Sequence, residues 1–301
     1  MGAEPSQPLS QKCAMTLKKP SRKKPSRNDP CPCGSGKKYA QCCLQPGGGH
    51  SASPAPATGE IAHALQTAVG HQQAGRLPQA EAIYRQILQV APNHPDALHL
   101  LGLIAHQVGK HEIAVELISK ALVFMPDYAE AHYNLGVVLK SQDKPDEAVA
   151  SYCQALRLKP DHAEAHYNLG VVLNGQGKLD EAASSYRQAL RFKPDHVDAH
   201  NNLGNTLQAQ RKLDEAASSY RQALALKPDY ADAHNNLGVT LNDLGKLEEA
   251  VASYRRALAL KPEYAEANNN LGIALRDQGK PDEAVACYGK ALALKPDYAE
   301  A

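Results

Sequence analysis

Apolar and small residues recur in this chain at the spacing of an α-helix, and the same short pattern returns along most of its length. Within residues 129–162 the apolar positions are Leu135, Gly136, Leu139, Ala148, Tyr152 and Ala155. Two such stripes with a 3.6-residue period predict two amphipathic helices in succession. We expect Gly136 and Ala148, which are small, to lie where the helices approach closely, with Tyr152 filling the space beside them.

Charged residues and prolines predict where these two helices begin and end. Asp127 and Glu130 form a D-x-x-E box, in which the first residue caps a helix and the second returns a hydrogen bond. Pro145 predicts the first turn of the second helix, where its missing N–H is harmless. Lys159 and Pro160 predict the end of that helix.

The helical pair returns every 34 residues, a period marked by Pro92, Pro126, Pro160, Pro194, Pro228, Pro262 and Pro296. A period this regular predicts a stacked array of one small unit. We delimit seven units, 61–94, 95–128, 129–162, 163–196, 197–230, 231–264 and 265–298, and residues 299–301 begin an eighth. The first unit has Thr67 and Ala68 where others have Leu and Gly, which predicts looser or capping packing, and the second has Ile118 in place of Tyr.

Composition divides the chain unevenly. Residues 1–43 hold nine Lys and Arg against two acidic residues, although the whole chain has a net charge of +1, so a basic arm precedes an acidic body. We expect residues 1–26, rich in Pro, Ser and Lys, to be a disordered arm, and residues 44–60 to be a flexible linker. The sequence contains no apolar run of ~20 residues and no secretory signal, so we expect a cytoplasmic protein.

Residues 27–43 contain a compact cluster of cysteines with the spacing C-x-C-x8-C-C, formed by Cys31, Cys33, Cys42 and Cys43. Four thiolates suit tetrahedral zinc, and Lys37 and Lys38 stand close enough to offset its negative charge. We therefore expect a zinc site, with free or disulfide-linked thiols as the alternative. Four cysteines close the metal site and leave no open position for catalysis.

The repeated pattern closely resembles the tetratricopeptide repeat (TPR) family. The resemblance implies an all-α solenoid, in which antiparallel helix pairs stack into a right-handed superhelix whose concave face is lined by the first helix of each pair. Residues 27–43 are very similar to the SEC-C motif of bacterial proteins, which implies a small zinc-bound docking module with an unknown partner. The common form of that motif ends in Cys-His, whereas this chain has Cys42-Cys43.

The sixth position of the first helix is asparagine in five successive units: Asn134, Asn168, Asn202, Asn236 and Asn270. An amide side chain has donors and an acceptor, as a peptide bond has. The ladder is similar to one in the TPR region of O-linked N-acetylglucosamine transferases, which implies that it holds an extended peptide. Contacts between repeats, or plain solvation, are the alternative. The fifth position carries no cation, so we do not expect a clamp for a terminal carboxylate.

The fourth position is histidine in four units, His132, His166, His200 and His234. Helices pack ~8–10 Å apart, so one histidine per repeat cannot converge on a metal ion. The basic arm would attract nucleic acid or anionic lipid, but without interleaved aromatic residues we expect a solvated tail.

The chain contains no catalytic or nucleotide-binding motif, so we predict no catalytic site in it. The function that we expect is a protein-interaction scaffold that binds a protein or peptide in the concave groove. The alternative is the substrate-recognition region of a longer glycosyltransferase like the O-linked N-acetylglucosamine transferases, because the sequence stops three residues into an eighth unit.

Overall fold

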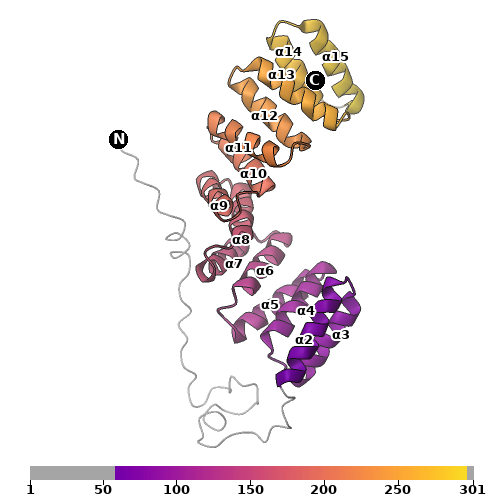
Figure 1. Ribbon diagram of the computed structural model, residues 1–301, viewed down its shortest axis with the longest axis vertical. Coiled ribbons are helices and arrows are strands. Elements are labelled where there is room, and N and C mark those ends of the chain that lie inside the picture. Colours follow the sequence, from indigo (N-terminus) through magenta and orange to yellow (C-terminus); the bar gives the residue numbers. More distant parts are fainter. Residues whose placement is uncertain (1–57, 297–301) are drawn as a thin grey trace, which may run out of the picture. The chain divides into compact units, whose positions relative to one another are not determined.

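The computed structural model describes residues 58–296, and every regular element in that range is an α-helix. The predicted basic arm, the cysteine cluster, most of the linker and the start of an eighth unit lie outside the described residues. The fourteen helices are α2 (Thr58–Gln73), α3 (Leu77–Val90), α4 (Pro95–Gln107), α5 (His111–Phe124), α6 (Ala129–Ser141), α7 (Pro145–Leu158), α8 (Ala163–Gly175), α9 (Leu179–Phe192), α10 (Val197–Ala209), α11 (Leu213–Leu226), α12 (Ala231–Asp243), α13 (Leu247–Leu260), α14 (Ala265–Asp277) and α15 (Pro281–Leu294) (Figure 1).

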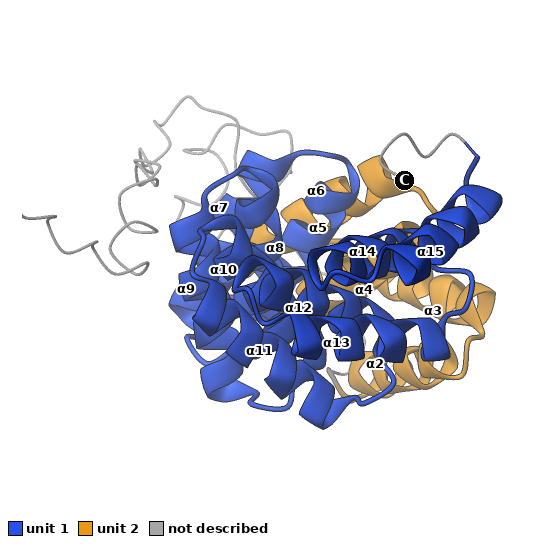
Figure 2. Cartoon of the chain, turned by 90° about the horizontal axis from the view of Figure 1, so that it is seen from above, with its two compact units in different colours: residues 1–10, 128–301 blue, residues 11–127 orange. Residues whose placement is uncertain are grey.

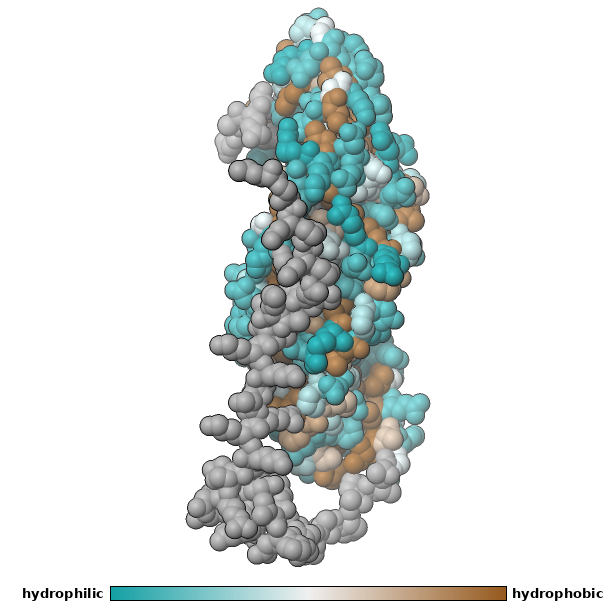
Figure 3. All heavy atoms as spheres, turned by 90° about the vertical axis from the view of Figure 1, so that its left-hand side faces the viewer, coloured by the Kyte–Doolittle hydropathy of each residue, from teal (hydrophilic) through white to brown (hydrophobic). Residues whose placement is uncertain are grey.

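The chain divides into two compact units, which are coloured separately in Figure 2. Within the described residues, unit 1 contains α6 to α15 and unit 2 contains α2 to α5. The visible surface is mostly hydrophilic, with hydrophobic residues in small scattered groups (Figure 3). No helix in residues 58–296 is long and apolar enough to cross a membrane.

Helices pack first within a pair and then onto the next pair. In unit 1 each second helix packs against the first helix of the following pair, as α7 does with α8 and α9 with α10. Consecutive first helices also touch one another, whereas consecutive second helices do not approach as closely. The stack therefore curves with its first helices inside, and we call the face formed by α6, α8, α10, α12 and α14 the inner face. The predicted all-α solenoid of paired helices is confirmed.

A glycine lies against an aromatic ring inside each pair of unit 1. A Cβ added to Gly136 would lie 2.6 Å from Cε1 of Tyr152, and Tyr152 is fully buried. The same contact recurs in the following pairs at Gly170–Tyr186, Gly204–Tyr220, Gly238–Tyr254 and Gly272–Tyr288. The predicted role of Gly136 and Tyr152 is therefore confirmed.

Unit 2 keeps this contact with different residues. In its second pair, Ile118 lies against Gly102, so a shorter side chain replaces the ring. In its first pair, Ala68 takes the place of the glycine, yet both Ala68 and Tyr84 are fully buried. The hydroxyl of Tyr84 donates to Oε1 of Gln72 at 3.0 Å, so the ring still fills the pair.

The turn between the two helices of a pair requires a left-handed residue. After α8, the N–H of Gly177 donates to the carbonyl of Asn174 and the N–H of Lys178 to that of Leu173, which is the Schellman pattern. Gly177 has φ +72°, which glycine adopts without strain. Two pairs carry a larger residue here instead, Asp143 with φ 56° and Arg211 with φ 61°.

The predicted ends of the second helix are confirmed, and the predicted start of the first helix is wrong. α7 begins at Pro145 and ends at Leu158, with Lys159 as its C-cap. α6 begins at Ala129 with Tyr128 as its N-cap, so Asp127 lies outside the helix and Glu130 is the second helical residue. A capping box needs its acid at the third helical position, so Asp127 and Glu130 cannot form one.

Candidate peptide-binding face

The asparagines of the predicted ladder lie at one position of successive first helices of unit 1, and each is half-buried. Four of them donate a hydrogen bond from Nδ2 to the preceding repeat. The acceptors are Tyr133 Oη for Asn168 (3.2 Å), Tyr167 Oη for Asn202 (3.2 Å), Asn205 Oδ1 for Asn236 (3.0 Å) and Asn235 Oδ1 for Asn270 (3.2 Å). Contacts between repeats, which the sequence left as the alternative role, are therefore present.

In Asn236 and Asn270 these contacts use only part of the amide group. An asparagine amide has two N–H groups and an oxygen with two lone pairs, and the contact to the preceding repeat takes one N–H. In Asn168 the second N–H also donates to the carbonyl of Glu164 at 3.1 Å, and the oxygen accepts from Nζ of Lys140 at 3.1 Å. The oxygen of Asn202 accepts from Nδ2 of Asn201 at 3.4 Å. Nothing in residues 58–296 donates to Oδ1 of Asn236 or Asn270. Asn236 and Asn270 thus each retain an N–H and the oxygen for a further partner.

The fifth position of the first helix packs against the N-cap of the next first helix. The rings of Tyr133 and His162 lie 4.7 Å apart between centroids, and the Nδ1 of His162 accepts from the N–H of Ala165 at 3.4 Å. Because Nδ1 is the acceptor, the proton of the neutral ring is on Nε2, which lies 3.4 Å from a carboxylate oxygen of Glu130. Glu130 therefore contacts the next repeat.

The following interface repeats this arrangement with Glu164, Tyr167 and His196. The ring centroids of Tyr167 and His196 are 4.5 Å apart, and Nε2 of His196 lies 3.4 Å from Glu164. A hydrogen bond from Lys193, assisted by the charges of His196 and Lys193, lowers the pKa of Glu164 below its usual value although burial opposes this. Burial and the nearby carboxylates, among them Asp198, raise the pKa of Tyr167.

At the next two interfaces all three residues differ in size: the acid and the fifth-position residue are smaller, and the N-cap residue is larger. Asp198 replaces glutamate, Asn201 replaces tyrosine, and Tyr230 replaces histidine as the N-cap, with its hydroxyl donating to Oδ1 of Asp198 at 3.4 Å. The same combination recurs as Asp232, Asn235 and Tyr264. The smaller amide leaves room for the larger cap, and the longer phenol reaches the shorter acid. Asn201 and Asn235 are buried by this packing, so the fifth position holds neighbouring repeats together.

The histidines at the fourth position close the turn that precedes each first helix. Nε2 of His166 lies 2.9 Å from the carbonyl oxygen of Pro160, and His200 and His234 make the same contact with Pro194 and Pro228. A carbonyl only accepts, so Nε2 carries the proton. Burial lowers the pKa of His166 and His234 below its usual value. In the last pair, Asn268 donates instead to the carbonyl of Tyr264 at 3.1 Å.

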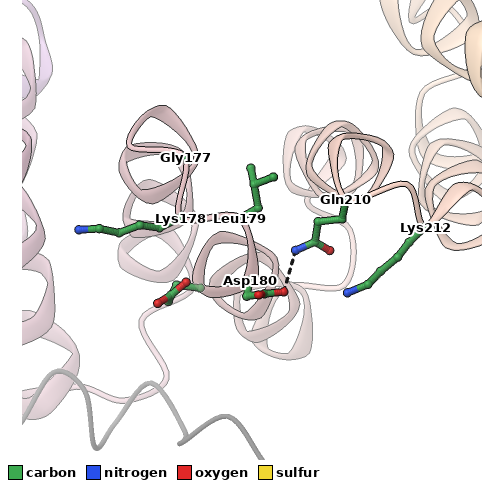
Figure 4. A pocket seen from close by; sticks show the side chains of 7 residues that line it. Gly177, Lys178, Leu179, Asp180, Gln210 and Lys212 are labelled. Atoms are coloured by element: carbon green, nitrogen blue, oxygen red, sulfur yellow. Dashed lines mark hydrogen bonds between the residues drawn. The ribbon is translucent and has the colours of Figure 1, made fainter. Parts of the chain in front are cut away.

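A polar hollow of about 480 Å³ lies away from the asparagine ladder, beside the turns that join α8 to α9 and α10 to α11 (Figure 4). Its lining includes Lys178, Asp180 and Lys212. Gln210 donates to Asp180 across it at 3.0 Å, the bond drawn as a dashed line in Figure 4. The hollow is open and its charges are exposed, so we do not place the binding site there.

Comparison with known families identifies the repeats. Residues 14–270 match the family described as "Cilia and flagella-associated protein 70 C-terminal domain", and residues 265–298 match the family "Tetratricopeptide repeat". The first match covers most of the chain. The chain belongs to this family of TPR domains. Its fold is that of TPR interaction scaffolds.

Two curated proteins are similar to short segments near the N-terminus of this chain. The chain is 80% identical over 25 residues to the protein translocase subunit SecA of Sulfurovum sp., which is 8% of this chain and 3% of SecA. It is 75% identical over 24 residues to the uncharacterized protein YecA of Escherichia coli, which is 8% of this chain and 11% of YecA. The chain thus spans only a small part of these relatives.

Solved structures are similar to the repeat array. YrrB, described as a TPR protein with an unusual peptide-binding site, is 25% identical, with a TM-score of 0.57 over 62% of this chain and 96% of YrrB. MamA is 25% identical, with a TM-score of 0.53 over 56% of this chain and 98% of MamA. PilF of Pseudomonas aeruginosa, at 23% identity and a TM-score of 0.59 over 69% of this chain and 94% of PilF, shares the fold.

Proposed function

We propose that the inner face of unit 1 binds an extended peptide or protein segment, and that the asparagine ladder holds its backbone. The observation that carries the proposal is the state of the ladder amides. Four asparagines are fixed by hydrogen bonds to the preceding repeat, and in Asn236 and Asn270 one N–H and the oxygen remain for a ligand. A peptide bond offers the complementary acceptor and donor.

Two features of the structure and one relative support this function. The first helices lie inside the curve of the stack, where a long ligand contacts several repeats at once. The asparagine side chains of the ladder are held in place before binding, so less side-chain entropy is lost when a ligand binds. YrrB, which is similar over most of its length, is described as a TPR protein with a peptide-binding site.

The test is a double substitution, Asn202→Ala with Asn236→Ala, in the full chain. The probe is the tightest binder that the wild-type protein selects from a library of random linear peptides, and affinity is measured by fluorescence anisotropy. Loss of the ladder hydrogen bonds should weaken binding by about tenfold or more. A wild-type protein that selects no peptide, or a double variant with unchanged affinity, would count against the proposal.

Two controls separate binding from folding. Gln188→Ala with Gln222→Ala removes two amides from the second helices α9 and α11, and should leave affinity unchanged. Tyr167→Phe removes the acceptor of Asn202 without changing the ladder residue itself. Circular dichroism of every variant shows whether the helices persist, so a loss of affinity in an intact array is assigned to the ligand contact.

We also propose that Cys31, Cys33, Cys42 and Cys43 bind one zinc ion in a small docking module. These residues lie outside the described part of the structure, and the support is the short similarity to SecA and YecA together with a donor set of four thiolates. Metal analysis of the reduced protein should find about one equivalent of zinc. Substitution of Cys42 and Cys43 by Ser should remove it; the same zinc content in that variant would contradict the assignment.

A further inference from the structure

The ninth position of the first helix is apolar in six of the seven repeats and polar in one. The apolar residues are Val69, Leu103, Val137, Val171, Val239 and Ile273, and all are half-buried. In the fifth repeat the residue is Asn205, which is exposed. This exception lies on α10, three residues after the ladder residue Asn202, and therefore on the same side of the helix.

Two donors hold the oxygen of Asn205. The hydroxyl of Tyr220 donates to Oδ1 of Asn205 at 2.7 Å, and Nδ2 of the ladder residue Asn236 donates to the same oxygen at 3.0 Å. The hydroxyl also lies 3.0 Å from Oε1 of Gln208. It has a single proton, and the shorter contact has the length typical of an O–H···O hydrogen bond, so we assign the proton to Asn205. Tyr220 is fully buried, which fixes this donor.

The held oxygen determines where the nitrogen of Asn205 points. Nδ2 lies opposite Oδ1 on the planar amide, and it makes no hydrogen bond within residues 58–296. The side chain is exposed, so its two N–H groups face outward from α10. Donors whose direction is already fixed bind an acceptor with a smaller loss of entropy than a free side chain does.

We propose that Asn205 determines the specificity of the inner face: it selects a ligand residue whose side chain carries a carbonyl or carboxylate oxygen, next to residues that are apolar. The neighbouring repeats present Val171 and Val239 at the same position, and these favour apolar ligand side chains on either side. The inference rests on the proposed function, because it concerns the peptide held by the asparagine ladder.

The experiment is a positional scan of the selected peptide against the full chain. Each position is replaced in turn by Gln, Glu and Leu, and affinities are measured for the wild type and for Asn205→Val. In the wild type, one position should prefer Gln or Glu over Leu by about 3- to 10-fold, the effect of one hydrogen bond. In Asn205→Val the preference at that position should reverse. Comparison of Gln with Glu shows whether the oxygen belongs to an amide or to a carboxylate.

The variant is expected to fold, because the third repeat has Val137 at the equivalent position, and the buried hydroxyl of its Tyr152 has no hydrogen-bond partner within residues 58–296. Tyr220→Phe serves as a second variant: it keeps Asn205 but removes one of the groups that fix it, and should reduce the preference without reversing it. If peptides bind and Asn205→Val shows the wild-type profile at every position, only this inference is overturned. If the wild type selects no peptide, the proposed function is overturned with it.

Discussion

Gly204 on α10 lies directly against the ring of Tyr220 on α11. A Cβ added to Gly204 would approach three ring atoms of Tyr220 to between 2.6 and 2.8 Å, and that ring is fully buried. Because real Cβ atoms do not come so close, the pair cannot accept even one methyl group without moving a helix or a ring.

Gly204→Ala should therefore destabilise the array. Overpacking costs about 1–3 kcal/mol, and the better helix propensity of alanine returns up to ~1 kcal/mol of it. Gly289→Ala is the matched control, since Gly289 lies inside α15 with no atom within 4 Å of the added Cβ. The control should gain about 0.5–1 kcal/mol. Urea unfolding followed by circular dichroism measures both; a stabilised Gly204→Ala would contradict the packing argument.

A large fifth-position residue is paired with a smaller N-cap at two interfaces, and a small one with a larger N-cap at the next two. This predicts energetic coupling between Asn201 and Tyr230. Asn201→Tyr alone should destabilise by about 1–3 kcal/mol, because Tyr230 already occupies the space that the new ring needs. Adding Tyr230→His recreates the pairing seen at Tyr133 and His162 and should recover at least ~1 kcal/mol.

The control for this double-mutant cycle combines Asn201→Tyr with Tyr264→His, which belongs to the next interface. These two substitutions share no interface and should be additive within ~0.5 kcal/mol. If Asn201→Tyr were coupled as strongly to Tyr264→His as to Tyr230→His, the idea that residues 201 and 230 depend on each other's size would be wrong. The cycle is measured by urea unfolding.

His166 and His234 predict a loss of stability in mild acid. Burial lowers their pKa in the folded protein, so the unfolded chain binds protons first as the pH falls. Well above the unfolded pKa of about 6.5 the two histidines are neutral in both states and do not change the stability. As the pH falls below that value, protonation of the unfolded chain progressively destabilises the protein. The double variant His166→Asn and His234→Asn introduces the residue that the last pair carries at this position, Asn268. It should lose less thermal stability than the wild type between about pH 7 and pH 5. If the melting temperatures of the two proteins fell equally between about pH 7 and pH 5, these histidines would not be the origin of the acid sensitivity.

Arg211 occupies a left-handed position that most repeats give to glycine. Its φ of 61° costs about 1–2 kcal/mol, whereas the exposed ion pair with Asp243 at 3.2 Å returns less than ~1 kcal/mol. Part of the gain is lost because glycine has more freedom in the unfolded chain, so Arg211→Gly should stabilise by roughly 0.5 kcal/mol. Asp143→Gly should gain less, since aspartate tolerates this conformation better. Melting temperatures compare the variants; a destabilised Arg211→Gly would be the contrary result.

Much of the fold could be predicted because a repeated contact leaves a repeated signal. The period, the paired helices, the start of α7 at Pro145 and the contact of Gly136 with Tyr152 all follow from residue size and spacing. The start of the first helix could not be placed, because the D-x-x-E pattern in the sequence is one residue out of step with the true N-cap, Tyr128. The sequence alone does not show which residue adopts the cap conformation.

The inner face was predictable in position but not in detail. Asn202 and its equivalents lie on the first helices as predicted, yet their bonds to the preceding repeat depend on distances that only the structure gives. The exchange of Glu164, Tyr167 and His196 for Asp198, Asn201 and Tyr230 is visible in the sequence. Its meaning requires knowing that an N-cap contacts two residues of the repeat before it.

The bond from Asn168 to Tyr133 joins residues 35 positions apart, and the one from Asn202 to Tyr167 has the same reach. Contacts of this kind join one helix pair to the next one along the chain. The array could therefore be shortened or lengthened by whole 34-residue periods. Excision of residues 197–230 would leave His196 to cap α12, one period further along. The number of ladder asparagines is in that sense adjustable by gene duplication or deletion, with no redesign of the hairpins that remain.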